Sequence, residues 1–259
     1  MIYPLTELKN LMCDKMVKFK EMKKKYNNVA VITARGGSKR IPRKNIKDFM
    51  GKPMIAYAIE TAKKSGLFSE IMVSTEDQEI ADIARKFGAS VPFMRSLNTA
   101  NDIATTFDVL DEVVSQYEEK GQVFDNLCCI YPCVPLLKPE HIVSAYNKFS
   151  SSGDVDSLVP AVRFSFPIQR AFVADADGLL SYREPEYKNF RSQDLEPTYH
   201  DAGMFYWYRW GYFSKVKEHA VLVKTAMYEM EEKFVQDIDN QSDWDMAELK
   251  YRILKEQDK

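Results

Sequence analysis

The residues with the clearest chemistry lie at positions 34–45, where the sequence reads Ala-Arg-Gly-Gly-Ser-Lys-Arg-Ile-Pro-Arg-Lys-Asn. Five of these side chains are cationic: Arg35, Lys39, Arg40, Arg43 and Lys44. Gly36 and Gly37 let the backbone turn sharply and approach a ligand closely. Backbone N–H groups and cationic side chains together bind phosphate oxygens. The string therefore predicts a loop that holds a triphosphate.

A pair of carboxylates, Asp237 and Asp239, is the candidate partner for a metal ion. In extended backbone, side chains two residues apart lie on the same side of the chain. Mg²⁺ commonly takes one or two protein carboxylates together with substrate phosphates and water. The same Asp-x-Asp spacing also occurs at 154/156, 175/177 and 243/245. The spacing alone therefore does not select the metal pair.

From Val29 onwards the sequence alternates between strand and helix patterns, which indicates a mostly parallel sheet covered by helices on both faces. We expect strands at 29–34, 71–74, 90–93, 127–131, 157–162 and 204–208, and helices at 53–64, 77–87, 104–119, from 139, and at 244–255. Such sheets bind ligands at the carboxyl ends of their strands. The loop at 34–45, residues 74–77 and residues 131–132 each follow a strand, so we expect them to line one site.

The chain divides into four predicted parts. Residues 1–28 form a Lys-rich amphipathic helical extension, and residues 29–162 form the nucleotide-binding α/β part. Residues 163–203 interrupt the alternation as an inserted lobe, with a hairpin expected around Asp177-Gly178. Residues 204–259 complete the α/β domain with the Asp pair and a C-terminal helix. An insertion of this length in a compact domain usually carries function or an interface.

The composition excludes several classes of protein. The 259 residues carry a net charge of −2 and are 45% hydrophobic, which is typical of a soluble globular protein. No apolar run approaches 18 residues and no signal peptide begins the chain, so we expect a cytoplasmic protein without a membrane span. The four cysteines contain no C-x-x-C pair and predict no zinc site. The basic residues gather in one loop and one terminal segment, which argues against nucleic acid.

The string at 34–45 resembles the signature of the CMP-sialic acid synthetase family, the acylneuraminate cytidylyltransferases. The likeness extends over nearly all of residues 29–256, and Asp237-Ile238-Asp239 with Asp243 is similar to the acidic segment of that family. The resemblance implies a Rossmann-like nucleotidyltransferase fold, also similar to GT-A enzymes, with a small inserted dimerisation lobe. It implies Mg²⁺ on Asp237 and Asp239.

The resemblance also carries site residues over. The implied nucleotide contacts are Ala34, Arg35, Gly36, Gly37, Ser38, Lys39, Asn45, Arg95, Ala104 and Thr106. The implied catalytic residues are Arg35, Lys44 and Asp239. The candidate sugar contacts are Tyr131, Arg170, Arg191, His200 and Tyr206.

Two departures from the family pattern bear on the sugar. Tyr131 stands where the family has the Gln of Q-P-T-S-P, and the family's R-P-N-G segment reads His200-Asp201-Ala202-Gly203 here. The segments at 166–172 and 199–203 are similar to the branch of the family that activates pseudaminic acid, a 9-deoxy nonulosonic acid with two acylamido groups. A less polar pocket would suit that sugar.

These features predict an enzyme that converts CTP and an acidic nine-carbon sugar, pseudaminic acid, into CMP-sugar and pyrophosphate, as a homodimer. The same reaction on N-acetylneuraminic or legionaminic acid is one alternative. A GT-A-type glycosyltransferase, which also uses an Asp-x-Asp pair, is a second. A non-catalytic nucleotide sensor is a third, although a chain with both the basic loop and the acidic pair argues against it.

Overall fold

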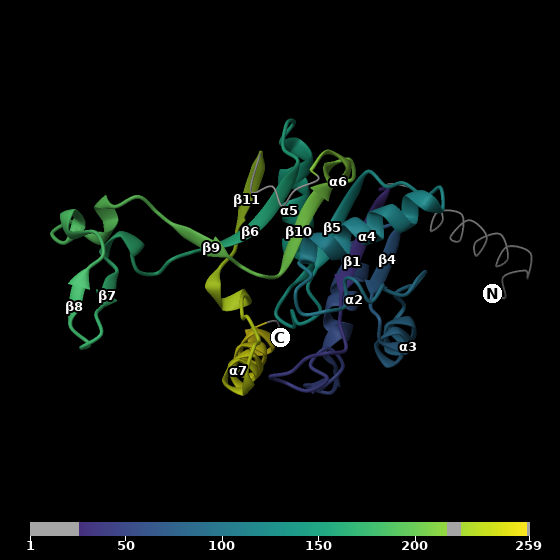
Figure 1. Ribbon diagram of the computed structural model, residues 1–259, viewed down its shortest axis with the longest axis horizontal. Coiled ribbons are helices and arrows are strands. Elements are labelled where there is room, and N and C mark those ends of the chain that lie inside the picture. Colours follow the sequence, from purple (N-terminus) through teal and green to yellow (C-terminus); the bar gives the residue numbers. More distant parts are fainter. Residues whose placement is uncertain (1–25, 217–223, 258–259) are drawn as a thin grey trace, which may run out of the picture.

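The computed structural model describes residues 26–216 and 224–257. Its main sheet, within these residues, has the strand order β11-β6-β10-β5-β1-β4, and β9 pairs with β6 (Figure 1). The strands are β1 (Asn28–Thr33), β4 (Glu70–Ser74), β5 (Asn126–Ile130), β6 (Ser157–Arg163), β9 (Tyr199–Asp201), β10 (Phe205–Arg209) and β11 (Thr225–Glu229). β1 runs parallel to both of its neighbours, and β10 runs antiparallel to β5 and β6. The predicted mixed, mostly parallel sheet is confirmed.

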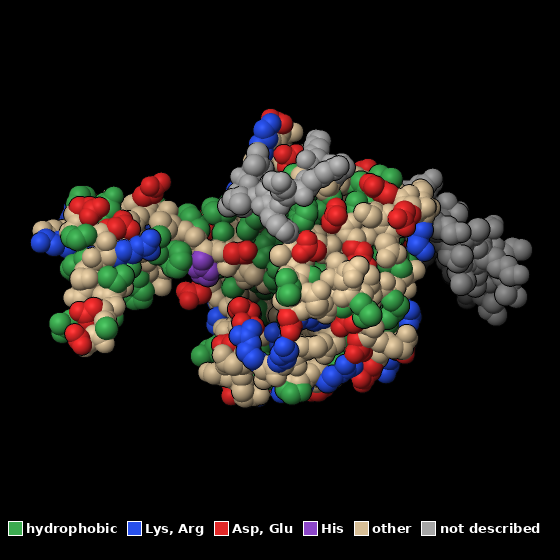
Figure 2. Space-filling model, viewed as in Figure 1, with side chains coloured by type: hydrophobic (Ala, Val, Ile, Leu, Met, Phe, Trp, Pro, Cys, Tyr) green, Lys and Arg blue, Asp and Glu red, His purple; other side chains and the backbone are tan. Residues whose placement is uncertain are grey.

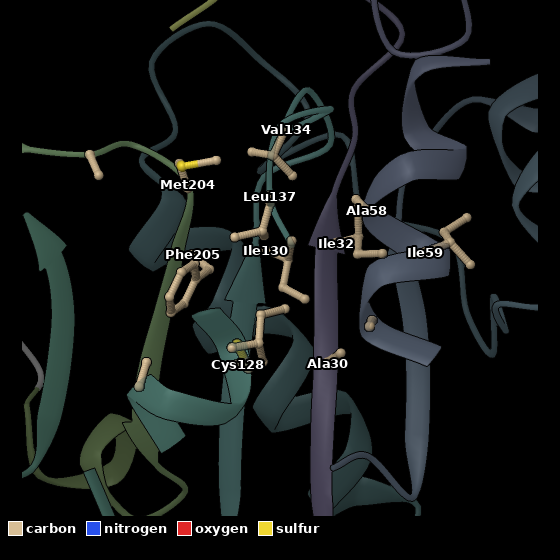
Figure 3. Close-up of a cluster of buried hydrophobic side chains, with 14 of the residues drawn as sticks. Ala30, Ile32, Ala58, Ile59, Cys128, Ile130, Val134, Leu137, Met204 and Phe205 are labelled. Atoms are coloured by element: carbon tan, nitrogen blue, oxygen red, sulfur yellow. The ribbon is translucent and has the colours of Figure 1, made fainter. Parts of the chain in front are cut away.

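Helices cover both faces of the sheet. Successive side chains of β1 point to opposite faces, so each face has an apolar surface for helices to pack against. The helices are α2 (Met54–Ser65), α3 (Gln78–Phe87), α4 (Thr106–Glu119), α5 (Pro139–Ser151), α6 (Tyr212–Lys215) and α7 (Gln241–Gln257). Ala30 and Ile32 of β1 pack in one core cluster with residues of α2, α3 and α5, and Figure 3 shows Ala58 and Ile59 of α2 on that side. Val29 and Val31 pack in a second cluster with residues of α4. A strand buried on both faces explains the unbroken apolar run of β1.

One expected strand is absent and two expected helices begin at other residues, each for a local reason. The expected strand at 90–93 is a single bridge between Ser90 and Met72. The helix α4 begins at Thr106 because Thr105 forms a capping box with Asp108. The last helix begins at Gln241 rather than 244, because Asp243 accepts hydrogen bonds from the N–H groups of residues 239 and 240. The strand β11 was not expected from the sequence. The expected N-terminal helix at 1–28 lies outside the described residues apart from its last three positions.

A small lobe extends from one edge of the sheet (Figure 1). It contains the hairpin of β7 (Phe172–Ala174) and β8 (Leu180–Tyr182), with Gly178 in the turn at φ 82°. The short 3₁₀ helices η1 (Ile168–Arg170), η2 (Pro185–Tyr187) and η3 (Ser192–Asp194) flank it. β9 returns the chain to the body by pairing antiparallel with β6. The lobe is therefore joined to the body at the end of β6.

An aromatic cluster fixes α7 against the hairpin that precedes α2. β2 (Asp48–Phe49) and β3 (Lys52–Pro53) form a small hairpin that buries Phe49. The Phe49 ring lies 5.3 Å from Trp244 and 5.7 Å from Tyr251, both on α7. The same cluster includes Ile41 and Ile238, which lie in the two segments that carry the predicted chemistry. Edge-to-face aromatic packing thus places the basic loop beside the acidic pair.

No helix within 26–216 and 224–257 is long and apolar enough to cross a lipid bilayer.

Candidate active site

A cavity of about 640 Å³ opens at the carboxyl ends of β1 and β5. It is lined by eleven of the residues that the sequence singles out: Arg35, Ser38, Lys39, Lys44, Asn45, Arg95, Ala104, Thr106, Tyr131, Asp237 and Asp239. Basic and acidic side chains lie next to one another on the lower part of the body in Figure 2. The volume is within the range of ordinary ligand sites. The basic loop at 34–45, the nucleotide contacts predicted at Arg95, Ala104 and Thr106, and the Asp pair therefore share one cavity.

The backbone of the basic loop is shaped by the turn that follows β4. The N–H of Gly36 donates to Glu76 Oε1 at 2.7 Å, and a Cβ at Gly36 would lie 2.5 Å from Asp77 Oδ2. Gly36 is thus required by close approach to the protein's own carboxylates. Neither Gly36 nor Gly37 has a positive φ, whereas Arg43 does, at 56°. The backbone does bend at Gly36, as expected, without a left-handed conformation at either glycine.

Arg43 holds the loop in place rather than facing the cavity. Its guanidinium contacts both oxygens of Asp77, at 2.5 and 3.0 Å, and Glu79 at 2.5 Å. Asp77 also caps α3 by accepting the N–H of Ile80 at 3.0 Å. The hydrogen bonds from Arg43 hold the pKa of Asp77 below its usual value, although partial burial opposes them. One carboxylate therefore ties the loop to the start of α3.

Asp77→Ala is expected to lower the free energy of unfolding by about 1 kcal/mol, because α3 loses its N-cap. The Arg43 pair is partly exposed and adds little to that figure. Since the folded-state pKa is lowered, the contribution of Asp77 is present above the unfolded pKa of about 3.9 and is lost as the pH falls through the folded value. Urea unfolding at pH 7 and pH 3 measures both effects. Asp82→Ala is the control, since Asp82 pairs with Arg85 on the exposed face of the same helix.

Asp102 pairs with two of the predicted phosphate ligands. Its two oxygens lie 2.5 Å from Arg35 Nη1 and 2.5 Å from Lys39 Nζ. These two cations, first through hydrogen bonds and then through their charge, keep the pKa of Asp102 below its usual value. Sequence reasoning missed Asp102. The available signal was an acidic residue between Arg95 and Ala104, inside a loop already assigned to the nucleotide.

Asp102→Asn is expected to lower the Kd for CTP roughly two- to fivefold, because the triphosphate no longer displaces an exposed ion pair. Isothermal titration at low and high salt measures this change, and the gain should shrink at high salt. Asp82→Asn provides a matched surface control. A rise in Kd would contradict the prediction and would indicate that Asp102 contacts the bound nucleotide complex.

The acidic segment meets the end of the basic loop. Lys44 Nζ donates to the carbonyl of Ile238 at 2.5 Å and lies 3.7 Å from Asp239 Oδ1. Arg40 lies 2.8 Å from the same oxygen. Among the described residues no cation forms an ion pair with Asp237, and partial burial together with nearby Asp239 raises the pKa of its carboxyl. The pair therefore combines one neutralised carboxylate with one that lacks a cationic partner.

The donor set fits a divalent ion that also binds substrate. Within the described ranges, no group of three or more His, Cys, Asp or Glu side chains is arranged to hold a metal. Two carboxylates are nevertheless what Mg²⁺ commonly takes from a protein when phosphates and water supply the remaining ligands. Asp237 and Asp239 fit that role, and the other three Asp-x-Asp pairs line no part of the cavity.

Arg95 occupies the far wall of the cavity and is 7% exposed. Its guanidinium donates to the hydroxyl of Ser74 at 3.0 Å and to the carbonyl of Ser74 at 2.6 Å, so the end of β4 orients it. Glu112 of α4 accepts the N–H of Ser96 at 2.7 Å and fixes the next residue. The expectation that residues 74–77 line the site is therefore wrong: none of them lines the cavity, and Ser74 acts indirectly by orienting Arg95.

The candidate sugar contacts are not brought together. Arg170 donates to the carbonyl of Phe190, and Arg191 pairs with Asp194, both in the lobe. His200 is exposed on β9, with its ring 4.9 Å from Phe164. None of these three lines the cavity, because the lobe extends away from the body. Their roles remain predictions.

Tyr131 and Tyr206 lie together. Tyr131 lines the cavity, and Tyr206 is buried behind it with the two ring centroids 5.5 Å apart. The Tyr131 hydroxyl lies 3.1 Å from Thr106 Oγ1. Of the five candidate sugar contacts, Tyr131 is the one that reaches the cavity wall.

The fold and this cavity define a nucleotide-dependent transferase, and the comparisons with known proteins specify the class. The family model described as cytidylyltransferase matches residues 29–257, so the chain belongs to the cytidylyltransferase family and is a nucleotidyltransferase. Pseudaminic acid cytidylyltransferase of Campylobacter jejuni (serotype O:23/36) is 40% identical over 229 residues, which are 87% of this chain and 97% of that protein. N-acylneuraminate cytidylyltransferase A of Danio rerio is 34% identical over 87% of this chain and 50% of its own length.

Solved structures agree on the fold. CMP:2-keto-3-deoxy-manno-octonic acid synthetase complexed with CTP matches with a TM-score of 0.65 and 20% identity, covering 89% of this chain and 99% of the other. At that identity the likeness shows the fold alone. The family resemblance, the α/β nucleotidyltransferase fold and the enzyme class predicted from sequence are confirmed, in preference to a glycosyltransferase or a nucleotide sensor.

Proposed function

We propose that this enzyme transfers CMP from CTP to pseudaminic acid and releases pyrophosphate. The observation that carries the proposal is the single cavity in which Arg35, Lys44 and the Asp pair meet, in a chain 40% identical to a pseudaminic acid cytidylyltransferase. Cations that bind the phosphates and carboxylates that can hold a metal ion are what transfer from a triphosphate to a sugar hydroxyl requires.

The residues take distinct roles in this reaction. Arg35 and Lys44 neutralise the charge that develops on the α-phosphate and the leaving pyrophosphate, and Ser38 and Lys39 bind the outer phosphates. Asp237 and Asp239 would hold Mg²⁺, which would neutralise charge on the phosphates. The 2-hydroxyl of the sugar attacks the α-phosphorus in line as the bond from the α-phosphate to pyrophosphate breaks, and one of the two carboxylates accepts its proton. Arg95, Ala104 and Thr106 contact the cytosine.

A homodimer forms part of the proposal. The lobe exposes large apolar side chains, among them Phe166 at 83%, Leu179 at 69% and Leu180 at 67%. Exposed apolar surface of this kind commonly marks an interface. A lobe that reaches the cavity of a second copy would bring Arg170 and Arg191 of one protomer to the sugar carboxylate in the other. Because CTP is a cytoplasmic metabolite, we place the reaction in the cytoplasm.

The test measures pyrophosphate release from CTP and Mg²⁺ with pseudaminic, legionaminic or N-acetylneuraminic acid. Release with pseudaminic acid at a kcat/KM well above the other two is the expected result. Preferential release with another sugar would keep the reaction and overturn the substrate. CTP binding without release from any of the three would overturn the proposed reaction.

A further inference from the structure

Asp201 lies where the lobe rejoins the body, and its carboxylate turns towards the sheet. It is the last residue of β9 and pairs with Ala161 of β6. Its Oδ1 accepts the N–H of Gly203 at 2.8 Å, across a turn in which Gly203 has a φ of 63°. Its Oδ2 accepts the hydroxyl hydrogen of Tyr206 at 2.8 Å. Both oxygens are thus fixed by the segment that connects β9 to β10.

A short series of contacts connects Asp201 to the cavity. Tyr206 is 7% exposed, and its ring packs at 62° against the ring of Tyr131. The hydroxyl of Tyr131 lies 3.1 Å from Thr106 Oγ1, and Tyr131, Thr106 and Gly203 all line the cavity. The backbone N–H of Tyr131 donates to the carbonyl of Met204 at 2.8 Å, so the end of β5 and the start of β10 are also joined directly. The Tyr206 ring therefore supports the Tyr131 ring, which forms part of the cavity wall.

The carboxylate of Asp201 is well suited to hold this wall. Among the described residues no Arg, Lys or His side chain pairs with it, so its strongest partner is the phenol of Tyr206. A hydrogen bond from a hydroxyl to a carboxylate is stronger than one between neutral groups. A buried phenol whose acceptor is removed would lose its orientation or take up a new partner. The position of Tyr206 therefore depends on Asp201.

We propose that Asp201 is a positioning residue for the acid sugar: through Tyr206 it fixes the Tyr131 wall against which the sugar binds. This inference rests on the proposed function for the identity of the sugar. It concerns the sugar half of the cavity, because the basic loop and Arg95 are held by other contacts, those of Glu76, Asp77 and Ser74. Thr106, the proposed cytosine contact beside Tyr131, is held at the start of α4 by the capping box of Thr105 and Asp108. The effect of Asp201 should therefore separate the sugar from CTP.

The experiment compares Asp201→Ala, Asp201→Asn and Tyr206→Phe in steady-state kinetics and in CTP titration. Asp201→Ala and Tyr206→Phe should each raise the KM for the acid sugar about tenfold, the loss of a hydrogen bond to a charged group. The KM and the Kd for CTP should stay within twofold of wild type. Asp201→Asn keeps an acceptor oxygen and should recover most of the affinity for the sugar. Asp154→Asn is the control, since Asp154 pairs with Lys224 at the other end of β6.

Two results would overturn the inference. One is a sugar KM that stays within twofold of wild type in Asp201→Ala, with thermal unfolding confirming a folded protein. The other is a parallel rise in the KM for both substrates, which a merely structural role would produce. If the wild-type enzyme released no pyrophosphate with any of the three sugars, the proposed function would fail separately. Calorimetric binding of each sugar to the CTP complex would then decide the role of Asp201.

Discussion

Arg35→Ala is expected to lower kcat at least about a hundredfold, because a positioned cation on the reacting phosphates is lost. Arg35 lines the cavity and pairs with the exposed carboxylate of Asp102, which a triphosphate can displace. A neutral side chain at this position leaves the developing charge on the α-phosphate without its donor. Pyrophosphate release under saturating CTP and sugar measures the loss.

The matched control is Arg85→Ala, which removes an arginine from the exposed face of α3, where it contacts Asp82 and lies outside the cavity. It should leave kcat within twofold of wild type. Turnover of Arg35→Ala near the wild-type rate would remove Arg35 from the reaction and would leave Lys44 as the cation that acts.

Asp239→Asn is expected to lower kcat by about two orders of magnitude, because the proposed Mg²⁺ site would lose one of its two carboxylates and the phosphates would lose the metal ion that positions them. Asp239 contacts Arg40 and Lys44, and it shares the cavity with Asp237. Loss of its charge should also raise the Mg²⁺ concentration needed for half-maximal rate. A titration of the rate against Mg²⁺, with and without EDTA treatment, measures both changes.

The sequence offers its own control for this result. Asp245 belongs to an Asp-x-Asp pair of the same spacing, but it lies on α7 and accepts a hydrogen bond from Gln241. Asp245→Asn should leave both kcat and the Mg²⁺ requirement unchanged. Equal losses in the two variants would mean that the 237/239 pair has no special role and would contradict the metal assignment.

Features that depend on neighbours in sequence were predictable. The apolar run of β1, the basic loop directly after it, the helix α3 and the turn at Gly178 each depend on a short segment of sequence. These short segments place the basic loop at the carboxyl end of a buried strand, which was the main prediction about the site. The family pattern then selected Asp237 and Asp239 from four equivalent spacings.

Features that depend on contacts between distant segments were not predictable. Asp102 pairs with residues more than sixty positions away, and nothing in its local pattern indicates those partners. The expected strand at 90–93 fails because only Ser90 meets the sheet edge. The lobe, which leaves the sheet at the end of β6 and returns through β9, carries Arg170 and Arg191 away from the cavity of their own chain.

The aromatic contacts between Phe49 and α7 also determine when the enzyme can become active during its synthesis. Lys44 and Ile238 touch although 194 positions separate them, and Trp244 and Tyr251 hold their two segments together. A nascent chain can therefore form β1 and its basic loop well before the acidic pair has been synthesised. Until then the basic loop lacks the neighbouring carboxylates. Catalytic competence should appear only after α7 has emerged from the ribosome and has packed against the β2–β3 hairpin.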